Sequence, residues 1–427
     1  MRRSFTAERR KLAAQLPART VALACLLGPF AFAAVLTLQS GVPADTLFGV
    51  WVHSSGYATS LVVLGFAGTW GFPVIAGVLA GDLFSSEDRY GTWKTVLTRS
   101  RTRRDVFAGK ALAAAVFGAA MLVLAAASSL VAGLVFTGDQ SLIGLSGTLI
   151  GSGTCLAMVL LSWAVSVLPL LAFMSLAILF SVATRNGILG VLGPVLVALV
   201  MQLLALLGSG EWVHLLLVAS AFDDWHGLFA AHRFYSQLEV SSAVSVMWVV
   251  VCLGAAWLLL RRRDFAGPPV ARRAGWVAPA RTAIAVAALL ALAAAATSWG
   301  PTRITPARLR AAITPTFNGL TTIQQDMLGR HVPPGSKLDQ LSFCRRRGTQ
   351  KSGPGDDWYC TFDVLVPQLG AIPYQDTPIT YDLSVKSNGC YKAESPPLLI
   401  GPQTFKDDHG HTVANPLFTI YGCLDPV

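Results

Sequence analysis

The 427-residue sequence contains few charged side chains. Asp, Glu, Lys and Arg together make up 13% of it, whereas hydrophobic residues make up 53%. That charged share is about half of what an ordinary soluble domain carries. The scarcity excludes an ordinary soluble globular protein and indicates a chain that crosses a membrane.

Charged groups are also missing from the middle of the apolar runs. The interiors of seven such runs contain no Asp, Glu, Lys, Arg or His. Ion-coupled transporters commonly use intramembrane carboxylates or histidines, and membrane-embedded hydrolases need acid, base or metal-binding groups at that depth. The absence argues against both classes, although sodium coupling through backbone carbonyls stays open.

Two chemical motifs are absent as well. The chain has no G-x-x-x-x-G-K-[ST] phosphate-binding loop, because Gly109-Lys110 is followed by Ala111. If the protein is part of a pump, its energy must therefore come from another polypeptide. No C-x-x-C spacing occurs, and the histidines of the C-terminal part have no nucleophile beside them. We therefore expect no metal, no cofactor and no catalytic residues.

Seven apolar runs are long enough for membrane-spanning helices, which need about 20 residues. They cover residues 21–38, 61–81, 107–136, 155–183, 188–207, 243–260 and 282–299. The first run follows a long basic segment without a convincing small-residue cleavage site, so we expect it to stay in the mature protein. Residues 1–19 place apolar side chains opposite basic ones, which is typical of an interfacial helix that leads into a span.

Lysine and arginine predict the orientation of these spans. They gather in residues 1–19, 83–110 and 261–281. The loops 39–60 and 137–154 contain none. Since basic loops stay in the cytoplasm, the N-terminus is predicted inside and, with seven spans, the tail outside the plasma membrane. The net charge of +10 then indicates anchoring to anionic membrane lipid, with no nucleic-acid partner.

Four of the seven cysteines lie in this tail: Cys344, Cys360, Cys390 and Cys423. Cysteines confined to the region predicted outside favour a disulfide-stapled domain, and the spacing argues against a metal site. Sequence allows three pairings. We favour Cys344 with Cys360 and Cys390 with Cys423, because residues 357–366 resemble a strand that follows a turn.

The rest of the tail is typical of a small, mostly β domain. Residues 381–386 alternate, residues 387–389 form a turn signal, and residues 390–393 can return as the second strand of a hairpin. Residues 306–327 indicate a helical or loosely ordered connector. The domain could capture substrate, cover an exit, contact an envelope partner or simply stabilise the protein.

The charged stretch between the second and third runs, residues 82–110, is the strongest functional signal. Ser85 and Asp88 resemble a capping box, after which Tyr90, Trp93 and Leu97 recur at helical spacing. A short amphipathic helix is therefore predicted. It could lie in the groove of a partner protein or rest on lipid headgroups.

Residue identities in this stretch resemble a known family. Glu87, Gly91 and Thr92, followed by a basic cluster and Gly109-Lys110, are similar to the E-x-x-x-G-T to G-K loop of the type-two permeases of ABC transporters. In that family the loop contacts a separate ATPase subunit. The resemblance covers about residues 1–265. It implies partner-coupling roles for seven residues, Glu87, Tyr90, Gly91, Thr92, Trp93, Arg103 and Lys110.

The resemblance also implies architecture. Residues 1–19 would be an elbow helix, and the aromatic-rich residues 211–239 would form re-entrant helices on the outer side. Composition alone favours an interfacial aromatic belt for residues 211–239.

We therefore predict an all-α polytopic membrane bundle with a small, mostly β, disulfide-stapled extracytoplasmic domain. The predicted units are a six-span permease core at 20–264 with a coupling loop at 83–106, a cytoplasmic linker at 265–281, a seventh span at 282–299 and the outer domain at 300–427. The predicted protein is a non-enzymatic permease subunit of an ATP-driven exporter. It would pair with a copy of itself or a related permease, and with cytoplasmic ABC ATPase subunits. The alternative is a non-transporting sensor whose outer domain binds a ligand and whose basic loops recruit a cytoplasmic partner.

Overall fold

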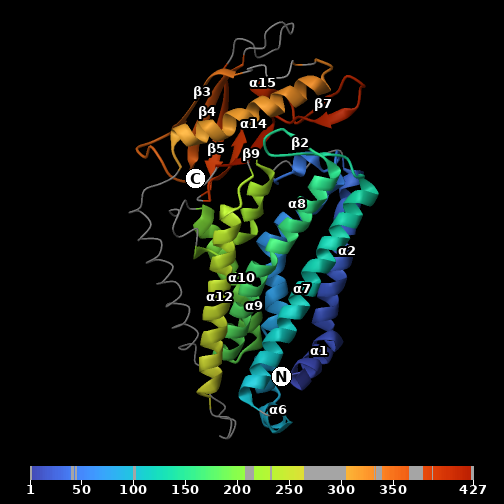
Figure 1. Ribbon diagram of the computed structural model, residues 1–427, viewed down its shortest axis with the longest axis vertical. Coiled ribbons are helices and arrows are strands. Elements are labelled where there is room, and N and C mark those ends of the chain that lie inside the picture. Colours follow the sequence, from blue (N-terminus) through green and yellow to red (C-terminus); the bar gives the residue numbers. More distant parts are fainter. Residues whose placement is uncertain are drawn as a thin grey trace.

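A bundle of long helices carries a β domain over one of its ends in this computed structural model (Figure 1). The structure describes residues 2–39, 43, 46–99, 102–206, 216–230, 233–263, 304–330, 332, 339–364, 378–386 and 388–424. Within these, six helical segments are long and apolar enough to cross a membrane: Leu16–Leu38, Gly56–Arg89, Arg103–Phe136, Ser152–Thr184, Gly187–Ala205 and Ser236–Arg261. They correspond to the first six predicted runs. The predicted linker and seventh span lie outside the described residues.

The first helix lies where the elbow helix is predicted. Helix α1 (Arg2–Ala14) stops one residue before α2 (Leu16–Leu38), whose first turn contains Pro17. Proline is well tolerated there because the first N–H groups of a helix have no partner within it. Both helices pack against the long helix α7 (Arg103–Phe136).

The second span is interrupted. Helix α3 (Gly56–Phe66) passes through a five-residue π-helical turn, η2 (Ala67–Gly71), into α4 (Phe72–Ala80). π-Helical turns are rare in proteins, and those that occur are often found at functional sites. Glycine is needed at Gly68, because an added Cβ would lie 2.8 Å from the Cβ of Phe222.

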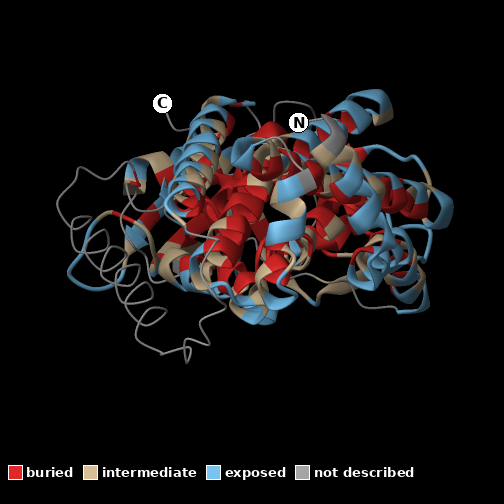
Figure 2. Cartoon of the chain, turned by 90° about the horizontal axis from the view of Figure 1, so that it is seen from below, coloured by how far each residue is buried: buried red, intermediate tan, exposed pale blue. Residues whose placement is uncertain are grey.

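Helix α9 occupies the centre of the bundle and packs against α4, α7, α10 and α12. The bounds of the later helices are α8 (Ser152–Val165), α9 (Val167–Thr184), α10 (Gly187–Leu206) and α12 (Ser236–Arg261). Figure 2 shows the buried residues along the middle of the molecule and exposed ones around them. Many of the exposed side chains on α2, α7, α10 and α12 are large and apolar, as a lipid-facing surface requires.

Short elements close the domain end of the bundle. They are η1 (Gly49–Trp51), the paired strands β1 (Leu142–Ile143) and β2 (Leu149–Ile150), η3 (Ser220–Phe222) and η4 (Asp224–Phe229). The rings of Phe222, Trp225 and Phe229 are buried inside the protein. Trp225 stacks on Phe48, and Phe222 lies against Phe72. The aromatic-belt interpretation is therefore wrong for these three rings.

The C-terminal domain is an antiparallel five-stranded sheet in the order β3-β4-β5-β6-β9, with helix α14 (Pro306–Met327) on one face. The strands are β3 (Asp339–Arg346), β4 (Gly355–Val364), β5 (Ile379–Val385), β6 (Cys390–Glu394) and β9 (Thr419–Cys423). A short helix, α15 (Pro397–Ile400), and the hairpin of β7 (Thr404–Lys406) with β8 (Thr412–Ala414) complete it. The predicted hairpin is confirmed as β5 and β6.

Helix α14, predicted as a helical or loosely ordered connector, is a helix that packs against the sheet. Its Phe317 stacks on Phe362 of the sheet with ring centroids 4.2 Å apart.

Both favoured disulfides are confirmed. Cys344 is opposite Cys360 in the register of β3 and β4, and Cys390 is opposite Cys423 in that of β6 and β9. The two bridges therefore fasten strands at both edges of the sheet.

Candidate functional site

The charged loop lies at the end of the bundle opposite the C-terminal domain (Figure 1). It forms two short helices, α5 (Ser85–Arg89) and α6 (Trp93–Arg99). Gly91 lies between them with φ of +64°, a left-handed conformation that ends one helix and redirects the chain into the next. The predicted amphipathic helix is thus confined to α6, and Tyr90 stands outside it.

The predicted capping box is wrong. Ser85 makes no side-chain cap, and its hydroxyl donates to Asp82 Oδ1 over 2.8 Å. The backbone N–H groups at the start of α5 find their hydrogen-bond acceptor on another span instead. The Ser181 hydroxyl oxygen of α9 accepts the backbone N–H groups of Phe84 at 3.2 Å and of Ser85 at 3.0 Å.

Glu87 and Lys110 form the centre of a buried ionic cluster. The Lys110 side chain is 0% exposed, and its Nζ lies 2.9 Å from Glu87 Oε1 and 2.9 Å from Glu8 Oε1. Glu87 also accepts from Lys11 Nζ at 2.7 Å and from the hydroxyl of Thr92. Two carboxylates therefore balance two ammonium groups. A charge in such a position is tolerated only when it is paired and hydrogen-bonded.

A second ionic contact joins the loop to the last described span. The Arg263 guanidinium, just after α12, pairs with both carboxylate oxygens of Asp88. It also lies 5.7 Å from the ring centroid of Trp93, whose indole N–H donates to Asp88 Oδ1 at 2.9 Å. Trp93 is buried and stacks on Phe84.

Of the remaining predicted residues, Tyr90 and Gly91 lie on the surface, whereas Arg103 bonds to the backbone at the end of α12. Tyr90 is 71% exposed, and Gly91 beside it is exposed, so the two form the tip of the loop. Arg103 donates to the backbone oxygens of Arg261 and Arg263 at 3.1 Å and 2.9 Å. A cation at this position is favourable because the C-terminus of a helix carries partial negative charge.

The structure thus brings all seven predicted coupling residues to one end of the bundle. Sequence reasoning missed the ionic contacts that Glu8, Lys11, Asp88 and Arg263 make in this region. Lys11 and Glu87 are 76 positions apart, and Asp88 and Arg263 are 175 positions apart. Local periodicity carries no information on such pairs. The available signal was the clustering of acidic residues within otherwise basic segments.

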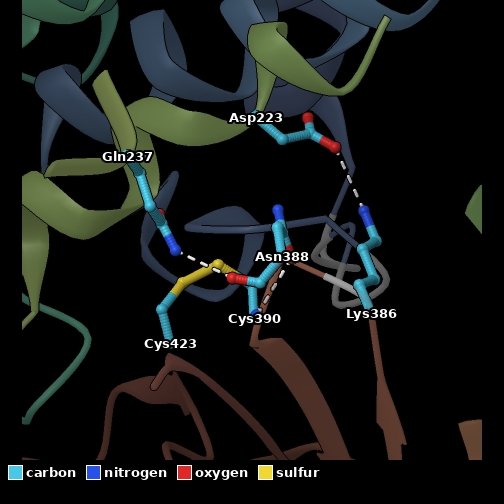
Figure 3. Close-up of a disulfide and its surroundings, with 6 residues drawn as sticks. All are labelled: Asp223, Gln237, Lys386, Asn388, Cys390 and Cys423. Atoms are coloured by element: carbon cyan, nitrogen blue, oxygen red, sulfur yellow. Dashed lines mark hydrogen bonds and ion pairs between the residues drawn. A yellow bond between two sulfur atoms is a disulfide. The ribbon is translucent and has the colours of Figure 1, made fainter. Parts of the chain in front are cut away.

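A cavity of about 530 Å³ lies at the opposite end, between the bundle and the C-terminal domain. Lys386 of the domain pairs there with Asp223 of the bundle, Nζ to Oδ2 3.1 Å, and Gln237 Nε2 donates to the backbone oxygen of Asn388 at 2.8 Å (Figure 3). The Asp223 carboxylate raises the pKa of Lys386, which keeps its ammonium group charged. Burial lowers the pKa of His226 to about 4, so its ring is neutral at neutral pH.

Six helices suited to cross a membrane and a domain with two disulfides define a helical membrane protein. A family model described as "Protein of unknown function (DUF2705)" matches residues 34–266. The match spans more than half of the chain, and the protein belongs to this family. It begins near the end of α2 and ends just after α12, so it covers the bundle except α1 and most of α2, and it leaves out the disulfide domain. No curated protein matches the chain.

Proposed function

We propose that this protein is the membrane-spanning permease subunit of an ATP-driven exporter similar to the type-two class of ABC transporters. The loop end would face the cytoplasm and the disulfide domain would lie outside the plasma membrane. The six-span core would be followed by the predicted seventh span at 282–299, which carries the chain back to the outer side. Cytoplasmic ATPase subunits would bind the tip around Tyr90 and Gly91.

The observation that carries the proposal is the construction of the loop. An exposed tip stands on a buried base in which Glu87 pairs with Lys110 and Asp88 pairs with Arg263. A partner that pushes on the tip would move these ion pairs as a unit. Since they are desolvated, they resist separation more strongly than surface pairs.

Three contacts give this push a route into the spans. Lys110 belongs to α7, Arg263 follows α12, and Ser181 belongs to α9. Each of these residues bonds directly to the loop or to its first turn. Movement of the loop would therefore tilt three spans together, which is what alternating exposure of a transport path requires.

Photocrosslinking at the loop tip tests this proposal. A photoreactive amino acid replaces Tyr90 in one variant and Tyr235, which is 50% exposed and directly precedes the domain end of α12, in the control. We expect the first variant to crosslink, in native cells, to a cytoplasmic protein with a phosphate-binding loop, and the control to give no such product. Equal products from both positions, or none from Tyr90, would contradict the proposal.

The sensor remains a second candidate because the cavity lies where the outer domain meets the bundle. A ligand there would touch both parts at once. A sensor predicts that the Tyr90 variant crosslinks to a kinase or another regulator without a transport ATPase. The same experiment therefore separates the two functions.

A further inference from the structure

The cavity at the domain end has two chemically different walls. The sheet side contributes residues from β5, β6 and β9, and the bundle side contributes residues from α3, η2, α10 and the turns η3 and η4. Its volume of about 530 Å³ falls inside the range of about 300–1,000 Å³ that is usual for small-molecule sites. The two walls together determine which ligand fits.

The sheet wall is lined by two lysine ammonium groups, those of Lys386 and Lys392. Strand register places Ser384 of β5 opposite Lys392 of β6, and Lys386 directly follows the end of β5. Both side chains line the cavity, and they are 45% and 29% exposed overall. Each ammonium group has a carboxylate partner, Lys386 with Asp223 at 3.1 Å and Lys392 with Glu394 at 2.7 Å. Because an ammonium group carries three N–H donors, each lysine can donate to an anionic group of a ligand as well as to its carboxylate partner.

The bundle wall is apolar and long. It follows the second span from Leu61 to Trp70, about 14 Å at a rise of about 1.5 Å per residue. Across the cavity, Leu199 and Leu203 of α10 complete it. The π-helical turn lies at its lower end and directs Trp70 outward, where the side chain is 55% exposed.

This wall is also open to the side. Phe66, Trp70 and Leu203 are each about half exposed, and they belong to helices suited to cross a membrane. An apolar chain could therefore enter from the hydrocarbon without passing through water.

We propose that the cavity binds a single-chain amphiphile with an anionic head, such as a carboxylate or a phosphomonoester. The head would lie against Lys386 and Lys392, and the acyl chain would run along the second span toward Trp70. The ligand would enter from the lipid layer nearest the disulfide domain. This binding needs no ATPase and stands whether or not the export function proposed above holds.

The test uses the purified full-length chain in phosphatidylcholine nanodiscs without any partner protein. One arm uses diazirine-bearing palmitic acid, and the other uses diazirine-bearing lysophosphatidic acid, which separates a carboxylate from a phosphate head. Labelled peptides are located by mass spectrometry. We expect saturable labelling of peptides from α3–η2 and α10 in at least one arm, and competition by unlabelled acids that strengthens about fourfold with each added methylene.

Two matched substitutions on one helix provide the decisive comparison. Leu203→Trp fills the cavity, whereas Leu196→Trp changes a residue of similar exposure, 56% against 50%, that does not line it. We expect labelling to fall at least fivefold in the first variant and to stay unchanged in the second. Lys392→Met should lower the preference for palmitic acid over uncharged hexadecanol by about tenfold, the usual effect of losing a hydrogen bond to a charged group.

Three results would overturn the proposal. Labelling that rises linearly with probe concentration would indicate ordinary lipid contact. Equal labelling of the two leucine variants would place the probe elsewhere on the bundle. Crosslinks between two copies of the chain through residues that line the cavity would show that another protein surface fills the cavity.

Discussion

Substitutions in the buried ionic cluster should lower the stability of the protein strongly, and the effects of substituting Glu87 and Lys110 should not add. Glu87→Gln removes one of two carboxylates and leaves the fully buried Lys110 ammonium group with Glu8. Breaking a buried pair in this way costs about 3–5 kcal/mol, because the remaining charge stays desolvated. Lys110→Met should cost a similar amount. The double variant should lose at least about 2 kcal/mol less than the sum of the two, since neither orphan charge remains.

The assay is reversible unfolding of the purified chain by sodium dodecyl sulfate in mixed micelles. The chain supplies a matched control in Arg347 and Asp382, which are 2.6 Å apart and each 59% exposed. An exposed pair contributes about 0–1 kcal/mol, so its own cycle should show coupling below about 1 kcal/mol. Single variants of Glu87 and Lys110 that cost no more than this control, or that add without coupling, would refute the reasoning.

Three further predictions concern the charged loop and the C-terminal domain. Gly91→Ala should cost about 1 kcal/mol in the same unfolding assay because of its positive φ, whereas Gly28→Ala, inside α2 with open space around it, should be neutral or stabilising; equal effects would contradict the left-handed turn. Ser181→Ala should cost about 1–2 kcal/mol, because two backbone N–H groups at the start of α5 lose their acceptor, and an unchanged unfolding midpoint would argue against that cap. Replacing Cys390 and Cys423 together by alanine should lower the stability of the domain by about 3–4 kcal/mol, the loop-entropy value for a separation of 33 residues, as measured by resistance to proteolysis; a domain as resistant as the parent would exclude a stapling role.

Much of the fold could be predicted from composition and periodicity. The six described spans follow from apolar length alone, because a helix that crosses lipid needs one continuous apolar run. The hairpin of β5 and β6 follows from a turn signal between two short segments, and the pairing of Cys344 with Cys360 and of Cys390 with Cys423 follows from the strand signal at residues 357–366 after a turn. These features depend on neighbours in sequence.

The contacts that hold the charged loop come from residues far away in the sequence. Local sequence patterns therefore predicted these contacts wrongly. Ser85 and Asp88 have capping-box spacing, yet Asp88 is engaged by Arg263 and Trp93, and Ser181 takes the capping role. Lys110 has the sequence context of a loop cation, yet it is fully buried.

The cavity at the domain end could not be predicted from local sequence patterns either. Its walls come from segments that are far apart in the chain and meet only in the folded protein.

The central claim is that this chain works with a separate ATPase, and one measurement addresses it most directly. The chain is purified from its native cells in mild detergent, and the proteins that remain bound are identified and quantified by mass spectrometry. We predict a stoichiometric subunit with a phosphate-binding loop that is lost when the exposed Tyr90 is replaced by aspartate and retained in a Tyr235→Asp control. A preparation without any nucleotide-binding partner, or with a kinase or regulator in its place, would contradict the account.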